Sequence, residues 1–97
     1  MTQLSQDQKR ALKAKAHHLN PIVMIGQKGL TDSVLAEIDL ALFDHELIKI
    51  KSNCGNKLAA ESQALEIQEK LRAAFIARIG KVLIFYKRST KSNNTQR

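Results

Sequence analysis

The segment formed by Gly26, Gln27, Lys28 and Gly29 has the residue types and the spacing of a loop that binds phosphate. Glycine has no Cβ atom and adopts positive φ without strain, so a phosphate can lie close to the backbone amides of a GxxG loop. Lys28 adds a positive charge near the tip of the loop, whereas Gln27 is uncharged. Anion binding by this loop therefore depends on Lys28 and on backbone N–H groups.

An apolar run and a helix start enclose the loop. Residues 22–25 form a short apolar run that is typical of a strand. Thr31 is a favourable N-cap, and Leu30 and Leu35 have the spacing of a hydrophobic staple around it. The first turn of the helix adds unpaired N–H groups and the positive end of its dipole. A GxxG alone is usually a plain turn between two elements, and this context favours the phosphate-binding interpretation.

Basic and acidic residues are separated along the 97-residue chain, which carries a net charge of +7. Residues 1–29 contain five Lys or Arg against one acid, residues 30–69 contain three against eight, and residues 70–97 contain eight against none. The segment charges are therefore +4, −5 and +8. This separation predicts one positive and one negative face, with the positive face as the surface for nucleic acid. Aromatic residues make up only 4% of the chain, so RNA contacts should depend on charge more than on stacking.

Other classes of function find little support in the residues. Cys54 is the only cysteine, so no internal disulfide is possible, and we interpret it as a passive loop thiol. The three histidines have no metal-ligand spacing, so neither a metal nor a cofactor is expected. No carboxylate pair or His-based dyad indicates an enzyme. Neither a stretch of about 18 apolar residues nor a signal-peptide core is present, so we expect a cytoplasmic protein with no membrane partner.

The chain length suits one compact domain. We place this domain at residues 1–88 and interpret residues 89–97, which lack large apolar side chains, as a flexible basic tail. Periodicity, caps and turn residues predict helices over about residues 6–17, 32–43 and 57–72 and strands over about 22–25, 47–51, 75–79 and 82–86. The order α-β-α-β-α-β-β predicts an α/β (α+β) sandwich with three helices and a mixed four-stranded sheet.

Patterning within these elements predicts their faces. The first helix should place Leu4, Ala11, Leu12 and Leu19 on the core side and Lys9, Arg10, Lys13 and His17 on a basic side. In the strand over 47–51, Lys49 and Lys51 alternate with two isoleucines, so their face either binds a partner or is simply solvated. The strand over 82–86 is apolar without alternation, which indicates coverage on both faces and favours burial of Tyr86 over base stacking.

His17 has two possible roles, which the sequence leaves open. It lies at the C-terminus of the first helix, where a cation is favoured by the helix dipole, and it borders the basic side of the same helix.

Over nearly its whole length the chain resembles the CRM domain (chloroplast RNA splicing and ribosome maturation) in its single-domain bacterial, YhbY-like form. The resemblance is carried by Leu12, Ala16-His17, Pro21-Ile22-Val23, residues 25–31, Val34-Leu35, Ala41-Leu42, residues 45–51, Ile79-Gly80-Lys81 and residues 83–88. Residues 52–72 carry little of this signature, so the third helix is predicted mainly from its own periodicity.

The resemblance implies a non-catalytic RNA-binding protein that associates with precursors of the large ribosomal subunit. The implied fold is similar to the C-terminal domain of bacterial translation initiation factor three, and a monomer is expected. The RNA-binding residues that it implies are the loop Gly26, Gln27, Lys28 and Gly29 with Thr31, and the surrounding Lys9, Lys13, His17, Lys49, Lys51, Lys87 and Arg88.

Two other functions remain open from the residues alone. A small basic DNA-binding protein is the first, because phosphate contacts do not by themselves distinguish RNA from DNA. An enzyme that acts on RNA is the second and weaker one, since no catalytic constellation is present in the sequence.

Overall fold

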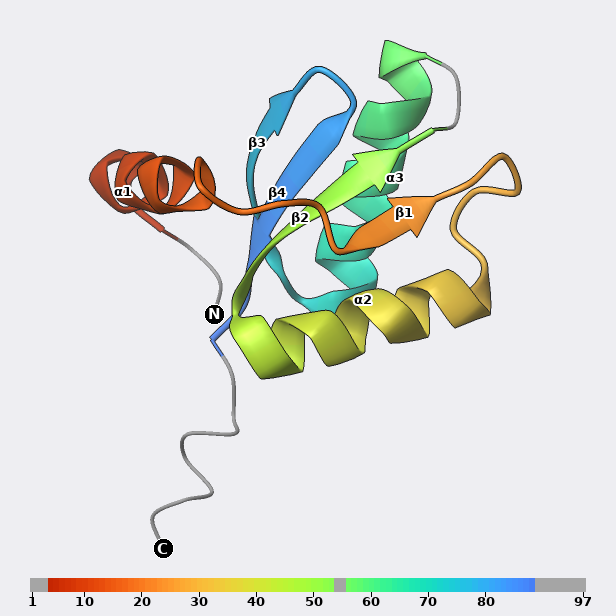
Figure 1. The fold of residues 1–97 in the computed structure, drawn as a ribbon, viewed down its shortest axis with the longest axis horizontal. Coiled ribbons are helices and arrows are strands. Elements are labelled where there is room, and N and C mark those ends of the chain that lie inside the picture. The colour runs from red at the N-terminus through yellow and green to blue at the C-terminus, as the bar shows by residue number, and fades with distance from the viewer. Residues whose placement is uncertain (1–3, 54–55, 89–97) are drawn as a thin grey trace, which may run out of the picture.

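A computed structural model describes residues 4–53 and 56–88 and contains seven elements in the predicted order (Figure 1). The helices are α1 (Gln6–Ala16), α2 (Asp32–His45) and α3 (Lys57–Leu71), and the strands are β1 (Val23–Ile25), β2 (Leu47–Ser52), β3 (Ala74–Ile79) and β4 (Val82–Tyr86). The predicted fold class is confirmed, and each boundary agrees within two residues. Cys54 and residues 89–97 lie outside the described residues, so the interpretations of a passive thiol and of a flexible tail stay predictions.

Side-chain caps explain why each helix begins where it does. The Ser5 hydroxyl accepts a hydrogen bond from the Gln8 N–H at 3.1 Å, and the Gln8 side chain accepts one from the Ser5 N–H at 2.8 Å. Thr31 Oγ1 accepts from the Val34 N–H at 3.2 Å, and Asn56 Oδ1 accepts from the Ala59 N–H at 2.8 Å. These bonds satisfy first-turn amides that have no partner within the helix.

The four strands form one mixed sheet in the order β1-β2-β4-β3. Strand β1 runs parallel to β2, with Val23 opposite Ile50, and β4 runs antiparallel to both β2 and β3. The central strand β4 buries three successive residues completely, Leu83, Ile84 and Phe85. Because successive strand residues point to opposite faces, both faces of the sheet must be covered here, as the apolar run predicts.

Helices cover the two faces unequally (Figure 1). Helices α2 and α3 pack on the face that carries Ile48, Ile50 and Leu83, and the main core lies between them and the sheet. Helix α1 packs on β2, β3 and β4 from the other side, where Ala16 is completely buried. The core therefore lies mainly on the α2 and α3 side, and the single helix α1 covers part of the other side.

Some of the predicted faces and ends are wrong in detail. Ala11, predicted on the core side, is exposed on α1. Leu19 is 37% exposed, because α1 ends at Ala16 and Leu19 lies in the connection that follows. His45 is the last residue of α2, and the turn that follows is made by Glu46, whose φ is positive at 64°. Ile22 precedes β1 and is half exposed, although its N–H donates to the Lys49 carbonyl at 3.1 Å.

The close approach of α1 to the sheet makes Ala16 a sensitive position. Substitution Ala16→Leu is expected to lower the free energy of unfolding by about 1–3 kcal/mol, because extra volume in a filled site forces the helix away from the sheet. The matched control is Ala14→Leu in the same helix, where the side chain is exposed and the expected change is within about 0.5 kcal/mol. Urea denaturation measures both, and equal stability of the two variants would contradict this packing.

Candidate nucleic-acid interface

The GxxG segment forms a tight turn between β1 and α2. The Gly29 N–H donates to the Gly26 carbonyl at 3.0 Å, which closes a four-residue turn with Gln27 and Lys28 at its centre. Neither central residue has positive φ, which excludes a type II turn, and glycine in the fourth position is typical of type I. Gly29 has a φ of +77°, which glycine adopts without strain, whereas the φ of Gly26 is not positive.

The amides at the tip of this turn have no acceptor in the described part of the protein. Within the part of the chain that the structure describes, the N–H groups of Gln27 and Lys28 make no hydrogen bond, and both residues are exposed. The Asp32 and Ser33 N–H groups in the first turn of α2 are also without an acceptor among these residues. The Asp32 carboxylate lies in that first turn and opposes a bound anion, so the turn tip is the better phosphate site.

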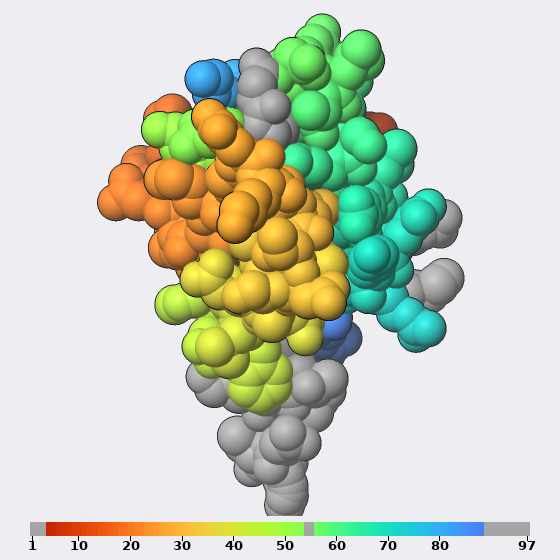
Figure 2. Space-filling view, turned by 90° about the vertical axis from the view of Figure 1, so that its right-hand side faces the viewer, coloured from red at the N-terminus to blue at the C-terminus, as the bar shows by residue number. Residues whose placement is uncertain are grey.

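Hydrogen bonds join the strand ends beside this turn to two other segments at the same end of the sheet. The Asn53 N–H donates to the Ile25 carbonyl at 2.8 Å, and the Ser52 N–H donates to the Lys81 carbonyl at 2.7 Å. The Ser52 hydroxyl also donates to Gln63 on α3 at 2.9 Å. Figure 2 shows the turn, in orange, on the same face of the molecule as the first turns of α3, in green, and the β3–β4 turn, in blue. The turn therefore belongs to one surface with the start of α3 and the β3–β4 turn, and hydrogen bonds hold the strand ends beneath it.

Several lysines lie at this end of the sheet. Lys28 lies in the turn, Lys51 near the end of β2, and Lys81 between β3 and β4, and all three are exposed. Lys57 and Lys81 line a small cavity of about 190 Å³. Neither was predicted as a site residue. The hairpin turn at Gly80-Lys81 was visible in the sequence, but its position beside the end of β2 depends on the strand order.

A second group of predicted cations lies on the α1 side of the sheet. Lys9, Lys13 and His17 are spaced four residues apart in α1 and its C-cap, and thus follow one face of the helix. In β2 the side chains of Lys49 and Lys51 point to the face opposite the buried Ile48 and Ile50, which is the face that α1 partly covers.

Acidic residues lie mostly on the other side of the sheet. Seven of the nine acids are in α2 and α3, namely Asp32, Glu37, Asp39, Asp44, Glu61, Glu66 and Glu69. Helix α2 contains no Lys or Arg, and α1 contains one acid, Asp7. The separation of charge along the sequence thus becomes a separation between the two sides of the sheet.

His17 serves as the C-cap residue of α1, and its ring meets that of His18 edge to face with the centroids 5.6 Å apart. Of the two roles that the sequence leaves open for His17, the structure therefore shows the position at the C-terminus of the helix. Tyr86, for which the sequence favours burial, is half-buried at the end of β4.

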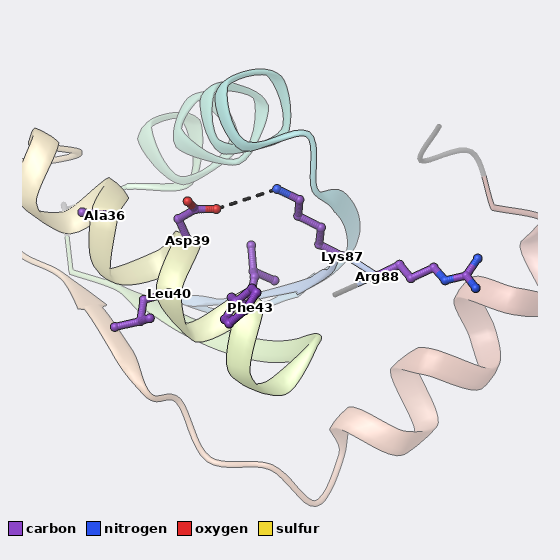
Figure 3. Close-up of a pocket in the computed structure, with 7 residues that line it drawn as sticks. Ala36, Asp39, Leu40, Phe43, Lys87 and Arg88 are labelled. Carbon is purple, nitrogen blue, oxygen red and sulfur yellow. Dashed lines mark ion pairs between the residues drawn. The ribbon is translucent and has the colours of Figure 1, made fainter. Parts of the chain in front are cut away.

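Lys87 and Arg88 are separated from the turn. Tyr86 lies opposite Leu47 and Val82 lies opposite Lys51, so the chain after β4 leaves the sheet at the end remote from the turn, about 13 Å along the strand. The Lys87 ammonium is 3.7 Å from the Asp39 carboxylate, and Arg88 extends away from that pair (Figure 3). Both cations line a cavity of about 400 Å³ beside Leu40 and Phe43. The structure thus places Lys28 and Lys51 at the same end of the sheet, and leaves Lys87 and Arg88 apart with Lys87 partly neutralised.

Two other observations bear on the class of site. Across residues 4–53 and 56–88, no cluster of three or more His, Cys, Asp or Glu side chains is arranged to hold a metal ion. Over the same residues, no helix has the length and the apolar character needed to cross a membrane.

Known proteins share both the sequence and the fold. The model of the CRS1/YhbY (CRM) domain matches residues 4–87. An RNA-binding protein of Haemophilus influenzae is 45% identical over 92 residues, which are 95% of this chain and 93% of the relative. A probable RNA-binding protein of Pseudomonas aeruginosa is 37% identical over 90 residues, 93% of this chain and 86% of the relative. The solution structure of a hypothetical protein of Staphylococcus aureus superimposes with a TM-score of 0.82 at 31% identity, covering 90% of this chain and 91% of the other.

The two glycines of the turn should differ in what they tolerate. Substitution Gly29→Ala is expected to cost about 1–2 kcal/mol of folding free energy, because an L-residue resists positive φ. A Cβ atom at this position meets nothing nearer than Gln63 Nε2 at 3.8 Å, so the loss comes from the backbone and not from a clash. The matched control Gly26→Ala should be nearly neutral, and Gly29→Asn should lose less than Gly29→Ala, since Asn tolerates the left-handed region. Equal losses at both glycines in denaturation experiments would refute this assignment of strain.

Proposed function

We propose that this chain, which belongs to the CRS1/YhbY (CRM) domain family, is a non-catalytic RNA-binding protein whose turn at Gly26, Gln27, Lys28 and Gly29 holds the phosphate backbone. The observation that carries the proposal is the pair of exposed N–H groups at Gln27 and Lys28, which have no acceptor in the described part of the protein. Two relatives that align over most of their length support it, one named as an RNA-binding protein and the other as a probable RNA-binding protein.

The proposed contacts position RNA without reading its sequence. Two backbone N–H groups and the Lys28 ammonium hold one phosphate, and the exposed side chains of Lys51 and Lys81 neutralise neighbouring phosphates along the end of the sheet. Lys9, Lys13, His17 and Lys49 extend this surface over the α1 side. The acids of α2 and α3 repel RNA from the other side of the sheet, so the molecule is expected to bind in one orientation.

We further propose that the RNA is ribosomal RNA in precursors of the large subunit, that the protein acts in the cytoplasm, and that it acts as a monomer. The resemblance to the single-domain bacterial form supports this role. Sedimentation of a cell lysate through a sucrose gradient tests it directly. Co-migration with a large-subunit precursor at low salt, and release at high salt, is the expected result. A protein that stays at the top of the gradient and is recovered with DNA in pull-downs would instead be the DNA-binding protein that the residues also allow.

Salt dependence should reveal which lysines meet phosphate. Each of Lys28→Ala and Lys51→Ala is expected to reduce the slope of log affinity against log salt by about one unit, because each removes one released counterion. Lys70→Ala is the matched control, since Lys70 lies on α3 on the acidic side and pairs with Glu66 at 3.0 Å. Lys87→Ala should change the slope by less than Lys28→Ala, because Asp39 already neutralises Lys87 in part. A Lys70→Ala effect as large as that of Lys28→Ala would place RNA on the acidic side and overturn the assignment.

Close approach of phosphate to the turn can be tested without straining the fold. At Gly26 a Cβ atom meets no atom within 4 Å and the φ is not positive, so Gly26→Val should leave the stability almost unchanged. The branched side chain should nevertheless weaken RNA binding about tenfold or more, because it stands where a phosphate would approach the amides. Filter binding or fluorescence anisotropy measures the affinity, and circular dichroism verifies the fold. Unchanged affinity in a folded Gly26→Val protein would rule out the phosphate site at the turn.

A further inference from the structure

A larger cavity, of about 660 Å³, lies on the α1 side at the end of the sheet remote from the GxxG turn. One wall is formed by the last turn of α1 and by the connection over residues 17–22, which passes across β2 in Figure 1. Its other wall is formed by His45 at the end of α2 and Leu47 at the start of β2. The volume is within the range of pockets that bind small molecules or parts of larger ligands.

The lining of this cavity combines apolar surface with groups that bind a nucleotide. Leu19 and Ile22 are large side chains that are 37% and 51% exposed. Beside them lie two imidazoles, His18 and His45, and the amide of Asn20. Lys15 adds an ammonium group, and the described lining residues include no carboxylate.

These groups suit the separate parts of one nucleotide. A planar base can stack on an imidazole or lie on an aliphatic side chain, an amide can pair with the edge of the base, and an ammonium can meet the adjoining phosphate. The edge-to-face contact between the His17 and His18 rings helps to hold the His18 ring in place at the cavity. A protein ligand could use the apolar surface equally well. The nucleotide is favoured because the described lining residues include a lysine and no carboxylate, and because the cavity continues into the basic face of β2.

The position of the cavity connects it to the proposed phosphate surface. Leu47 lines the cavity, and Lys49 and Lys51 follow it on the same face of β2 toward the GxxG turn. The Ile22 N–H bonds to the Lys49 carbonyl at 3.1 Å, which holds the cavity wall against this strand. From Leu47 to Lys51 the strand covers about 13 Å. A stacked single strand covers that distance with about four nucleotides.

We propose that this cavity holds one unpaired nucleobase of the bound RNA, about four nucleotides from the phosphate at the GxxG turn. The inference rests on the proposed RNA-binding function and adds to it a contact that reads a base. Phosphate contacts carry no sequence information, so the cavity is the place where this protein discriminates between RNA sequences. Leu19, Asn20 and His18 make the contacts to the base, and Lys15 meets its phosphate.

The experiment uses the full chain and short single-stranded RNA with one adenosine in a run of uridines. One series replaces the adenosine with an abasic nucleotide, and a second replaces it with 2-aminopurine, whose fluorescence falls when it stacks. The expected result is an affinity about tenfold lower for the abasic strand and quenched 2-aminopurine in the complex. In the variants Leu19→Ala and His18→Ala the difference between the intact and the abasic strand should disappear.

The control variant is Leu58→Ala, which removes the same side-chain atoms from a leucine that is 77% exposed on α3, and it should keep the full difference. Asn20→Ser provides a second test that leaves the apolar wall intact. It should reduce the preference for the strand with one adenosine over a strand of uridines alone. If the wild-type chain binds RNA through Lys28 but does not distinguish the intact from the abasic strand, the cavity does not bind a base and the proposal is overturned. If the wild-type chain binds no RNA, the proposed function itself fails.

Discussion

The burial of β4 on both of its faces is the constraint on which the rest of the structure depends. Leu83, Ile84 and Phe85 are completely buried and point alternately to opposite sides of the sheet, so apolar surface must be covered on both sides. Helices α2 and α3 cover one side with a large core, and α1 covers the other through the small side chain of Ala16. The central position of β4 places the parallel pair of β1 and β2 next to it, with β1 at the edge.

This arrangement of layers converts the charge pattern of the chain into two surfaces. Helices α2 and α3 carry most of the acids, and their outer faces have to lie in water because their inner faces form the core. The basic residues of α1 and the lysines of β2 lie on the side that a single helix covers only in part. A polyanion therefore meets an attractive surface and a repulsive one, separated by the thickness of the sheet.

The GxxG turn lies where the carboxyl ends of β1 and β2 meet, and this position suits the phosphate binding that we propose for it. Its two central amides are free of partners within the described chain, while bonds from Asn53 to Ile25 and from Ser52 to Lys81 hold the surrounding backbone. A rigid pair of N–H donors beside a lysine needs no reorganisation to receive a phosphate. In the proposed function the turn contributes binding and orientation of the RNA, and the proposed base pocket at the other end of β2 contributes selectivity.

The sequence by itself determined the features that depend on interactions within a few residues. The caps at Ser5, Thr31 and Asn56 and the order of the seven elements are local in this sense, so they could be predicted and are observed. The charge separation was also readable, since it is a property of segments. Only the tertiary structure decided which segments meet. It placed Lys81 beside the end of β2, paired Lys87 with Asp39 at the remote end of the sheet, and put His18 and His45 around one cavity. These contacts depend on the strand order, which follows from how the buried faces of all seven elements pack together, and no local pattern contains that information.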